Sequence, residues 1–235
     1  MPEFVLLAED GCVPLDVLAF MAEALDLQMR RDVAPIYGGE PWTVSAMSSL
    51  DGVRDSSPGI RKVLTFRKRL DVAGALGYHT EVLGVEYAQA LVPSFDDTRI
   101  DGTTASHEVI ETFCDPGCNK SRPWSSGNLV DYETADPVEA DSYDMKISIG
   151  SQQRLVAVSN FVTPLWFGEP PGATRQYDFL SRLRGPFEMS PGGYFRLVDR
   201  SGAEHYIFAD ESARLRLQEK LANNTSRVRR RSKGR

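Results

Sequence analysis

Apolar and polar residues follow one another along the first half of the chain in a pattern that predicts short strands and two helices. Over residues 15–31 apolar side chains recur every three or four positions, which predicts an amphipathic helix that Pro35 ends. A second helix is predicted over residues 104–115, where Pro116 and Gly117 stop it. Short apolar runs between turn residues predict strands at residues 3–8, 42–47, 61–70, 72–78 and 86–92.

The second half of the chain has a less regular texture. An acidic segment covers residues 131–144, and short signals predict strands around Gly192-Gly193-Tyr194 and at 205–208, with a helix at 211–221. This order predicts an α+β fold with an irregular C-terminal half, because it lacks the βαβ rhythm of a doubly wound sheet. No linker precedes residue 223, so we expect one domain over residues 1–222 and a disordered basic tail over 223–235.

Charge is distributed unevenly along the 235 residues. The net charge is −6, but the last ten residues carry six basic side chains, so residues 1–225 have a net charge of −12. An acidic body argues against a phosphate-binding surface and suits either metal binding or plain solubility. The arginine-rich tail could contact nucleic acid nonspecifically. The basic residues of segment 61–70 are interpreted as a solvated strand edge.

Membrane and export signals are missing from the sequence pattern. No apolar run reaches the roughly 18 residues that a membrane helix needs, and no basic segment precedes the first apolar run as in a signal peptide. The three cysteines, Cys12, Cys114 and Cys118, are therefore expected to be free thiols in a reducing compartment. An alternative is a structural zinc site formed by Cys114, Cys118 and His107.

The stretch with the clearest chemistry lies in the second predicted helix. His107 and Glu111 are one helical turn apart and project from the same face, so both could bind one metal ion. Glu108 would lie beside that ion and could act as a general base, as in a His-Glu-x-x-His helix. Glu111 takes the place of the second histidine of that motif. The alternative is a surface helix whose histidine forms a local hydrogen bond.

The acidic segment is the expected source of a third metal ligand. Its six carboxylates repel one another unless they are solvated or neutralised by a cation. Glu133 lies 26 residues after His107, which leaves enough chain to return to the helix. The alternative is a solvated acidic loop. The carboxylates are Asp131, Glu133, Asp136, Glu139, Asp141 and Asp144.

Four motifs together resemble a branch of zincin-type metallopeptidases found in phage and bacterial genomes. They are Ala-Leu-Gly-Tyr-His at 75–79, Ala-Ser-His-Glu-x-x-Glu with a following Asp-Pro at 105–116, Glu-x-x-Asp-x-x-Glu at 133–139, and Val-Ser-Asn-Phe-Val-x-Pro-x-Trp-Phe at 158–167. The resemblance spans roughly residues 10 to 200. It implies a zincin-like fold, with a twisted mixed sheet, an N-terminal helix and a metal-bearing helix packed beneath the sheet. An edge strand, either 72–79 or 86–92, would line the cleft and pair with an extended peptide.

The resemblance also implies roles for individual residues. His107 and Glu111 would bind the metal, and Glu108 would be the general base. Glu133 is the preferred third ligand, with Asp136 and Glu139 as substitutes. His79 or Tyr143 would stabilise the oxyanion of a tetrahedral intermediate.

The implied function is hydrolysis of peptide bonds in a peptide or protein substrate by a zinc-dependent peptidase. Because Glu111 replaces a histidine, Mn²⁺ or Fe²⁺ is an alternative to Zn²⁺. The rival hypothesis is a noncatalytic phage virion or accessory interaction protein on a degenerate zincin scaffold, with phage structural proteins as partners. Under either hypothesis, the protein is expected in the cytoplasm of a bacterial host or in a virion.

Overall fold

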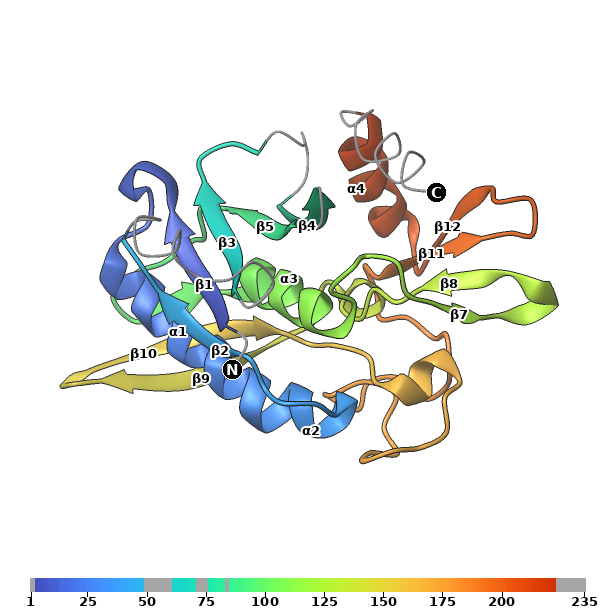
Figure 1. Ribbon diagram of the computed structural model, residues 1–235, viewed down its shortest axis with the longest axis horizontal. Helices are drawn as coiled ribbons and strands as arrows, with labels where there is room; N and C mark the ends of the chain where they lie inside the picture. Colours follow the sequence, from blue (N-terminus) through green and yellow to red (C-terminus); the bar gives the residue numbers. More distant parts are fainter. Residues whose placement is uncertain (1–2, 49–60, 71–75, 83–84, 223–235) are drawn as a thin grey trace.

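The N-terminal half of the chain builds a five-stranded sheet. The computed structural model describes residues 3–48, 61–70, 76–82 and 85–222. In the sheet β1 lies between β2 and β3 and runs parallel to both (Figure 1). The central strand β3 is also parallel to β5, whereas β4 is antiparallel to β5 and forms an edge. The strands are β1 (Glu3–Ala8), β2 (Thr43–Ala46), β3 (Arg61–Arg67), β4 (Gly77–Val82) and β5 (Val85–Leu91).

The first predicted helix is longer than its sequence pattern indicates. Helix α1 (Leu15–Gln28) continues through a π-helical turn (Met29–Val33) into the short helix α2 (Ala34–Tyr37). Pro35 therefore does not end the helix. It lies in the first turn of α2, where a missing backbone N–H is tolerated. The chain leaves the helix at Gly38, whose φ of 79° is in the left-handed region.

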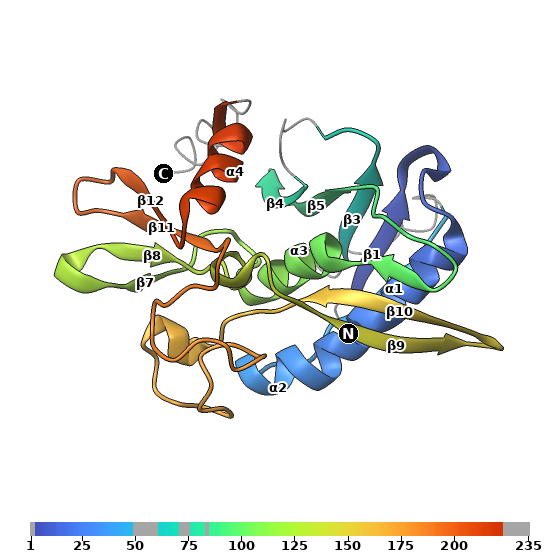
Figure 2. The same ribbon diagram turned by 180° about the vertical axis from the view of Figure 1, so that it is seen from behind.

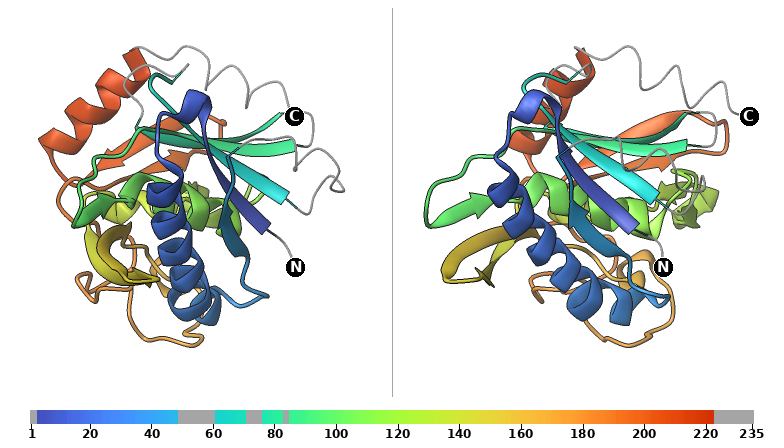
Figure 3. Two further views of the ribbon diagram at one scale, coloured as in Figure 1. Left: turned by 90° about the vertical axis from the view of Figure 1, so that its left-hand side faces the viewer. Right: turned by 60° about the vertical axis from the view of Figure 1, so that its left-hand side comes forward.

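Helix α3 (Thr103–Cys114) lies between two sheets. The five-stranded sheet covers one side of it, and the other side packs against a three-stranded sheet in the order β6-β10-β9 (Figure 3). The strands of this second sheet are β6 (Arg99–Asp101), β9 (Ser142–Ile149) and β10 (Gln152–Ser159). Ala105, Val109 and Ile110 are buried in the core between the sheets, so their apolar side chains hold α3 in place.

The C-terminal half is more regular than the sequence predicts. A four-stranded sheet in the order β12-β11-β8-β7 stands at one end of the molecule, opposite the tip of the β9–β10 hairpin (Figure 2). Its strands are short, and a long stretch of chain that includes β9 and β10 separates β8 from β11, so no strand periodicity is visible in the sequence. The elements are β7 (Ser121–Pro123), β8 (Leu129–Asp131), β11 (Tyr194–Val198), β12 (Glu204–Phe208) and helix α4 (Glu211–Ala222).

The α+β fold class predicted from the sequence is confirmed by these helices and three sheets. Among the residues that the structure describes, no helix has the length and apolar character that a membrane span requires. Residues 72–75 of the predicted small-residue strand and the basic tail at 223–235 lie outside the described residues.

Candidate metal centre

Helix α3 presents His107 and Glu111 on one face, as their spacing predicts. The Nε2 atom of His107 lies 3.2 Å from Oε2 of Glu111. The Glu111 side chain is almost wholly buried, with a relative exposure of 3%. A carboxylate at that depth needs hydrogen bonds, a positive partner or a cation.

Asp136 completes the group from a different part of the chain. It begins the 3-10 turn η4 (Asp136–Val138), and its Oδ1 lies 3.3 Å from Nε2 of His107. The backbone N–H of Ala135 donates a hydrogen bond of 3.2 Å to Oε1 of Glu111, which fixes this turn against α3. One ligand atom from each of His107, Glu111 and Asp136 lies within 4.8 Å of the other two. One nitrogen and two carboxylate oxygens at this spacing fit a divalent transition-metal ion.

The acidic segment divides into two sets of carboxylates. Asp131 is paired with Arg196, Asp141 with Arg182, and Asp144 with Arg99. The remaining three, Glu133, Asp136 and Glu139, line the pocket that contains His107. The segment is therefore not a uniformly solvated acidic loop, because half of its carboxylates are drawn into one cavity.

Glu108 lies in the same pocket and is held close to the edge strand. Its relative exposure is 5%. A Cβ atom at Gly77 of β4 would lie 2.9 Å from Oε1 of Glu108 and 2.6 Å from Cγ2 of Thr104. Only a glycine lets β4 approach α3 this closely, so Gly77 brings the strand backbone next to the predicted general base.

The electrostatics of the ligand group favour positive charge. Burial lowers the pKa of His107, but Glu111, Asp136 and Glu108 outweigh burial and raise this pKa well above its usual value. Burial raises the pKa of Glu111, as do Glu133 and Asp136, although His107 opposes them. A bound cation would satisfy the same negative charge that protons satisfy without it.

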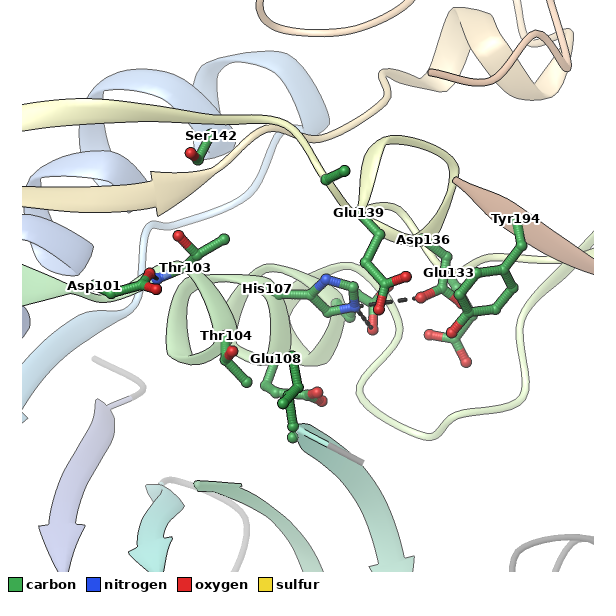
Figure 4. A pocket seen from close by; sticks show the side chains of 14 residues that line it. Asp101, Thr103, Thr104, His107, Glu108, Glu133, Asp136, Glu139, Ser142 and Tyr194 are labelled. Atoms are coloured by element: carbon green, nitrogen blue, oxygen red, sulfur yellow. Dashed lines mark hydrogen bonds and ion pairs between the residues drawn. The ribbon is translucent and has the colours of Figure 1, made fainter. Parts of the chain in front are cut away.

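The pocket around this group has a volume of about 250 Å³. In Figure 4 the side chains of Glu133, Asp136 and Tyr194 gather at one end and Asp101 lies at the other, with His107 between them. Glu133, the preferred third ligand of the sequence prediction, therefore lines the pocket. Glu139, the other substitute, points its carboxylate toward His107 (Figure 4).

Tyr194 is one of the pocket residues that the sequence analysis did not predict, together with Asp101, Thr103, Thr104 and Ser142. It follows Gly193, where a Cβ atom would lie 2.1 Å from the carbonyl oxygen of Pro137. The start of β11 can therefore pack directly on η4 and direct Tyr194 into the pocket. The glycine pair before Tyr194 was the available signal, because such a pair marks a close backbone approach.

The two predicted oxyanion residues have different outcomes. The hydroxyl of Tyr143 donates to Oδ2 of Asp32 at 2.7 Å and accepts from Nε2 of Gln28 at 3.0 Å, so it is engaged away from the pocket. Its neighbour Ser142 lines the pocket instead, since successive strand residues point to opposite faces. His79 is paired with Ala88 in the sheet, but its side chain lies outside the described residues.

A buried polar network anchors α3 from the opposite side. The hydroxyl of Ser106 donates to Oε1 of Gln28 at 2.7 Å and accepts from the backbone N–H of Ser159 at 2.9 Å. The Nε2 of Gln28 in turn donates to the carbonyl of Ser159 at 2.9 Å. Gln28, Ser106 and Ser159 have relative exposures of at most 1%. The network thus joins α1, α3 and β10, and its α3 member, Ser106, immediately precedes His107 in the sequence.

The cysteines show no sign of a second metal site. All three are free, and burial raises the pKa of the Cys114 thiol, which disfavours the thiolate that zinc binds. Within residues 3–48, 61–70, 76–82 and 85–222, the ligand group found is His107, Glu111 and Asp136, with no cysteine.

Comparison of the chain with protein-family models, with curated proteins and with solved structures finds no match. The function is therefore inferred from the geometry of the pocket and from the chemistry of its side chains.

Proposed function

We propose that the protein is a metal-dependent peptidase of the zincin type that hydrolyses peptide bonds. The observation that carries this proposal is the convergence of His107, Glu111 and Asp136 within 4.8 Å, with Glu108 lining the same pocket. Ligands at i and i+4 with a carboxylate beside the first ligand are the arrangement that a His-Glu-x-x-His helix uses.

The arrangement of the elements supports the proposal. The chain runs from a strand into a long helix, then builds a twisted sheet, and α3 packs beneath that sheet (Figure 1). The edge strand β4 lies beside the pocket, and Leu76 and Gly77 line it. An extended peptide paired with this edge would pass over His107 and Glu108.

The residues of the pocket can perform the proton transfers of hydrolysis. His107, Glu111 and Asp136 would hold a divalent cation, which would supply the Lewis acidity for activating water and polarising a carbonyl group. Glu108 accepts a proton from the attacking water and returns it to the leaving amine. The hydroxyl of Tyr194 can donate a hydrogen bond to the developing oxyanion. Because Glu108 is buried, its carboxylate is shielded from bulk water during both transfers.

The ligand set bears on the identity of the metal. One imidazole and two carboxylates are harder ligands than two imidazoles and one carboxylate, so Mn²⁺ and Fe²⁺ compete with Zn²⁺ at such a site. Glu133 could exchange with Asp136 as a ligand, since both line the pocket and both raise the pKa of Glu111.

Metal analysis combined with peptide cleavage tests this proposal. Wild-type protein should bind about one metal per chain. His107→Ala should lose the metal, whereas Glu108→Gln should keep it and lose at least about a hundredfold in turnover, the usual contribution of a general base. His205→Ala is the matched control, because His205 is exposed and pairs with Asp199 at 3.0 Å, far along the chain from α3.

Two results would contradict the proposal. Wild-type protein without bound metal, after exposure to Zn²⁺, Mn²⁺ and Fe²⁺, would remove the metal centre. Stoichiometric metal without cleavage of any member of a peptide library would favour the rival hypothesis, a noncatalytic virion or accessory protein in which the same ion is structural.

A further inference from the structure

Ser190 does not line the pocket, but each of its polar groups bonds to a segment that builds it. Its backbone N–H donates to the carbonyl oxygen of Pro137 at 3.1 Å, and its carbonyl oxygen accepts from the backbone N–H of Gly193 at 2.9 Å. Its hydroxyl donates to Oδ2 of Asp141. Since the relative exposure of Ser190 is 3%, these hydrogen bonds are shielded from water and costly to leave unmade.

The three partners of Ser190 are sequence neighbours of residues that line the pocket (Figure 4). The packing between two of these partners leaves no room for adjustment, because a Cβ atom at Gly193 would lie 2.1 Å from the carbonyl oxygen of Pro137. A displacement of Ser190 would therefore move pocket residues across single peptide links. Pro137 follows Asp136, Gly193 precedes Tyr194, and Asp141 lies between Ala140 and Ser142.

Asp141 is the second point at which Ser190 holds the segment that follows Asp136. Asp141 is 8% exposed, and its carboxylate accepts from Arg182 through Oδ1 and from Ser190 through Oδ2. The backbone N–H of Asp141 donates to the last carbonyl of η4 at 2.8 Å. Ser190 thus bonds to both ends of segment 137–141, to its first residue through the backbone N–H and to its last through the hydroxyl.

We propose that Ser190 is a positioning residue of the metal centre, which holds segment 137–141 at both ends and so keeps the carboxylate of Asp136 directed at His107. The proposal rests on the metal centre of the proposed function and adds a residue that acts on it from outside the pocket. Groups that orient a metal ligand without touching the metal typically change metal affinity by about 10- to 100-fold when they are removed.

The experiment compares metal affinity with stability in two variants that each lose one buried hydroxyl. Calorimetric titration of chelator-treated protein with Zn²⁺ and with Mn²⁺ should give a Kd about tenfold higher for Ser190→Ala than for the wild type. Thr163→Val is the matched control, because the buried hydroxyl of Thr163 donates to the carbonyl of Gln176 at 2.6 Å and neither residue lines the pocket. Urea denaturation of the metal-free proteins should show a comparable loss of stability in both variants, with the wild-type Kd kept in Thr163→Val.

A double-mutant cycle with Asp141→Ala tests whether the hydroxyl acts through Asp141. If it does, adding Ser190→Ala to Asp141→Ala should raise the Kd by less than about twofold, because the partner of the hydroxyl is already gone. If Asp141→Ala does not fold, the comparison of Ser190→Ala with Thr163→Val decides the proposal by itself.

Three outcomes would overturn the proposal: a wild-type Kd in Ser190→Ala, an equally raised Kd in Thr163→Val, or a further tenfold loss when Ser190→Ala is added to Asp141→Ala. The second outcome would reduce Ser190 to a residue that stabilises the fold. Wild-type protein that binds no metal would overturn both this proposal and the metal centre. Wild-type protein that binds metal without cleaving any peptide would count against the peptidase function alone, since the Kd is measured without turnover.

Discussion

Gly77 shows how a single missing side chain shapes the candidate site. It is the point where the edge strand β4 meets α3, and added atoms there would meet Thr104, Glu108 and the carbonyl oxygen of Gln89 within 3.2 Å. Side chains of α3 and the backbone of β5 therefore leave no room for a Cβ atom at this position. The position of Glu108 in the pocket therefore depends on a residue that carries no functional group.

Gly77→Ala should push β4 away from α3 and displace Glu108. We expect a loss of roughly 1–3 kcal/mol in the free energy of unfolding, the usual cost of overpacking, and a larger fractional loss of cleavage than of metal binding. Chemical denaturation and metal analysis measure the two effects. Gly172→Ala is the control, because nothing lies within 4 Å of a Cβ atom there. Equal behaviour of the two variants would show that the close approach at Gly77 is not required.

Residue chemistry could be predicted best where ligands lie close together in the sequence. The i and i+4 spacing of His107 and Glu111 determined their common face, and the structure places them 3.2 Å apart. The third ligand was harder to choose among Glu133, Asp136 and Glu139, because the sequence does not show which carboxylates pair with arginine. That choice depends on Arg182, Arg196 and Arg99, which come from distant elements.

At the scale of elements, α3 is held by contacts on three sides. Gly77 allows β4 to approach α3 closely. Gly102, just before α3, allows close approach to β10, since a Cβ atom there would lie 2.9 Å from the carbonyl oxygen of Ala157. On the third side, Ser106 donates a hydrogen bond to Gln28 of α1. A helix that supplies ligands needs this restraint, because small displacements change ligand geometry more than they change burial.

Gln28→Ala should loosen this restraint from a distance. It would leave the buried hydroxyl of Ser106 and the carbonyl of Ser159 without their Gln28 partners, at a cost of about 1–3 kcal/mol in unfolding free energy. Metal affinity should fall as well, because Ser106 precedes His107. Calorimetric titration with the metal measures this. Gln153→Ala is the control, because Gln153 lies in the exposed first part of β10. Unchanged affinity in Gln28→Ala would confine the network to a purely structural role.

Element prediction succeeded where periodicity was unbroken and failed where tertiary contacts decide the outcome. Strand β1 has the predicted bounds, and α3 differs from its prediction by one residue at each end. The extension through Pro35 was missed because the π-helical turn Met29–Val33 leads into a new helix in which proline occupies the first turn. Three-residue strands such as β7 and β8 are too short for a periodic signal, and their pairing with distant β11 defines them.

At the scale of the whole molecule, the candidate metal centre lies between two halves of the chain that have separate sheets. His107 and Glu111 belong to the helix beneath the five-stranded sheet, whereas Asp136 lies in the segment that leads from the third sheet to β9. The turn at Asp136 also supports β11, since the backbone N–H of Ser190 donates to the carbonyl of Pro137 at 3.1 Å. A cation at this junction would therefore tie the C-terminal sheet to α3.

Metal binding should consequently stabilise the entire fold and not only the pocket. A ligand that binds only the native state at about 100 times its Kd adds about 2.7 kcal/mol to the free energy of unfolding, so wild-type protein should unfold at a higher temperature with metal than with a chelator. His107→Ala and Asp136→Asn should lose most of this difference, while a chain ending at residue 222 should retain it, because the basic tail contributes no carboxylate. Thermal unfolding followed by circular dichroism measures the shift. An equal shift in His107→Ala would place the stabilising ion elsewhere in the molecule.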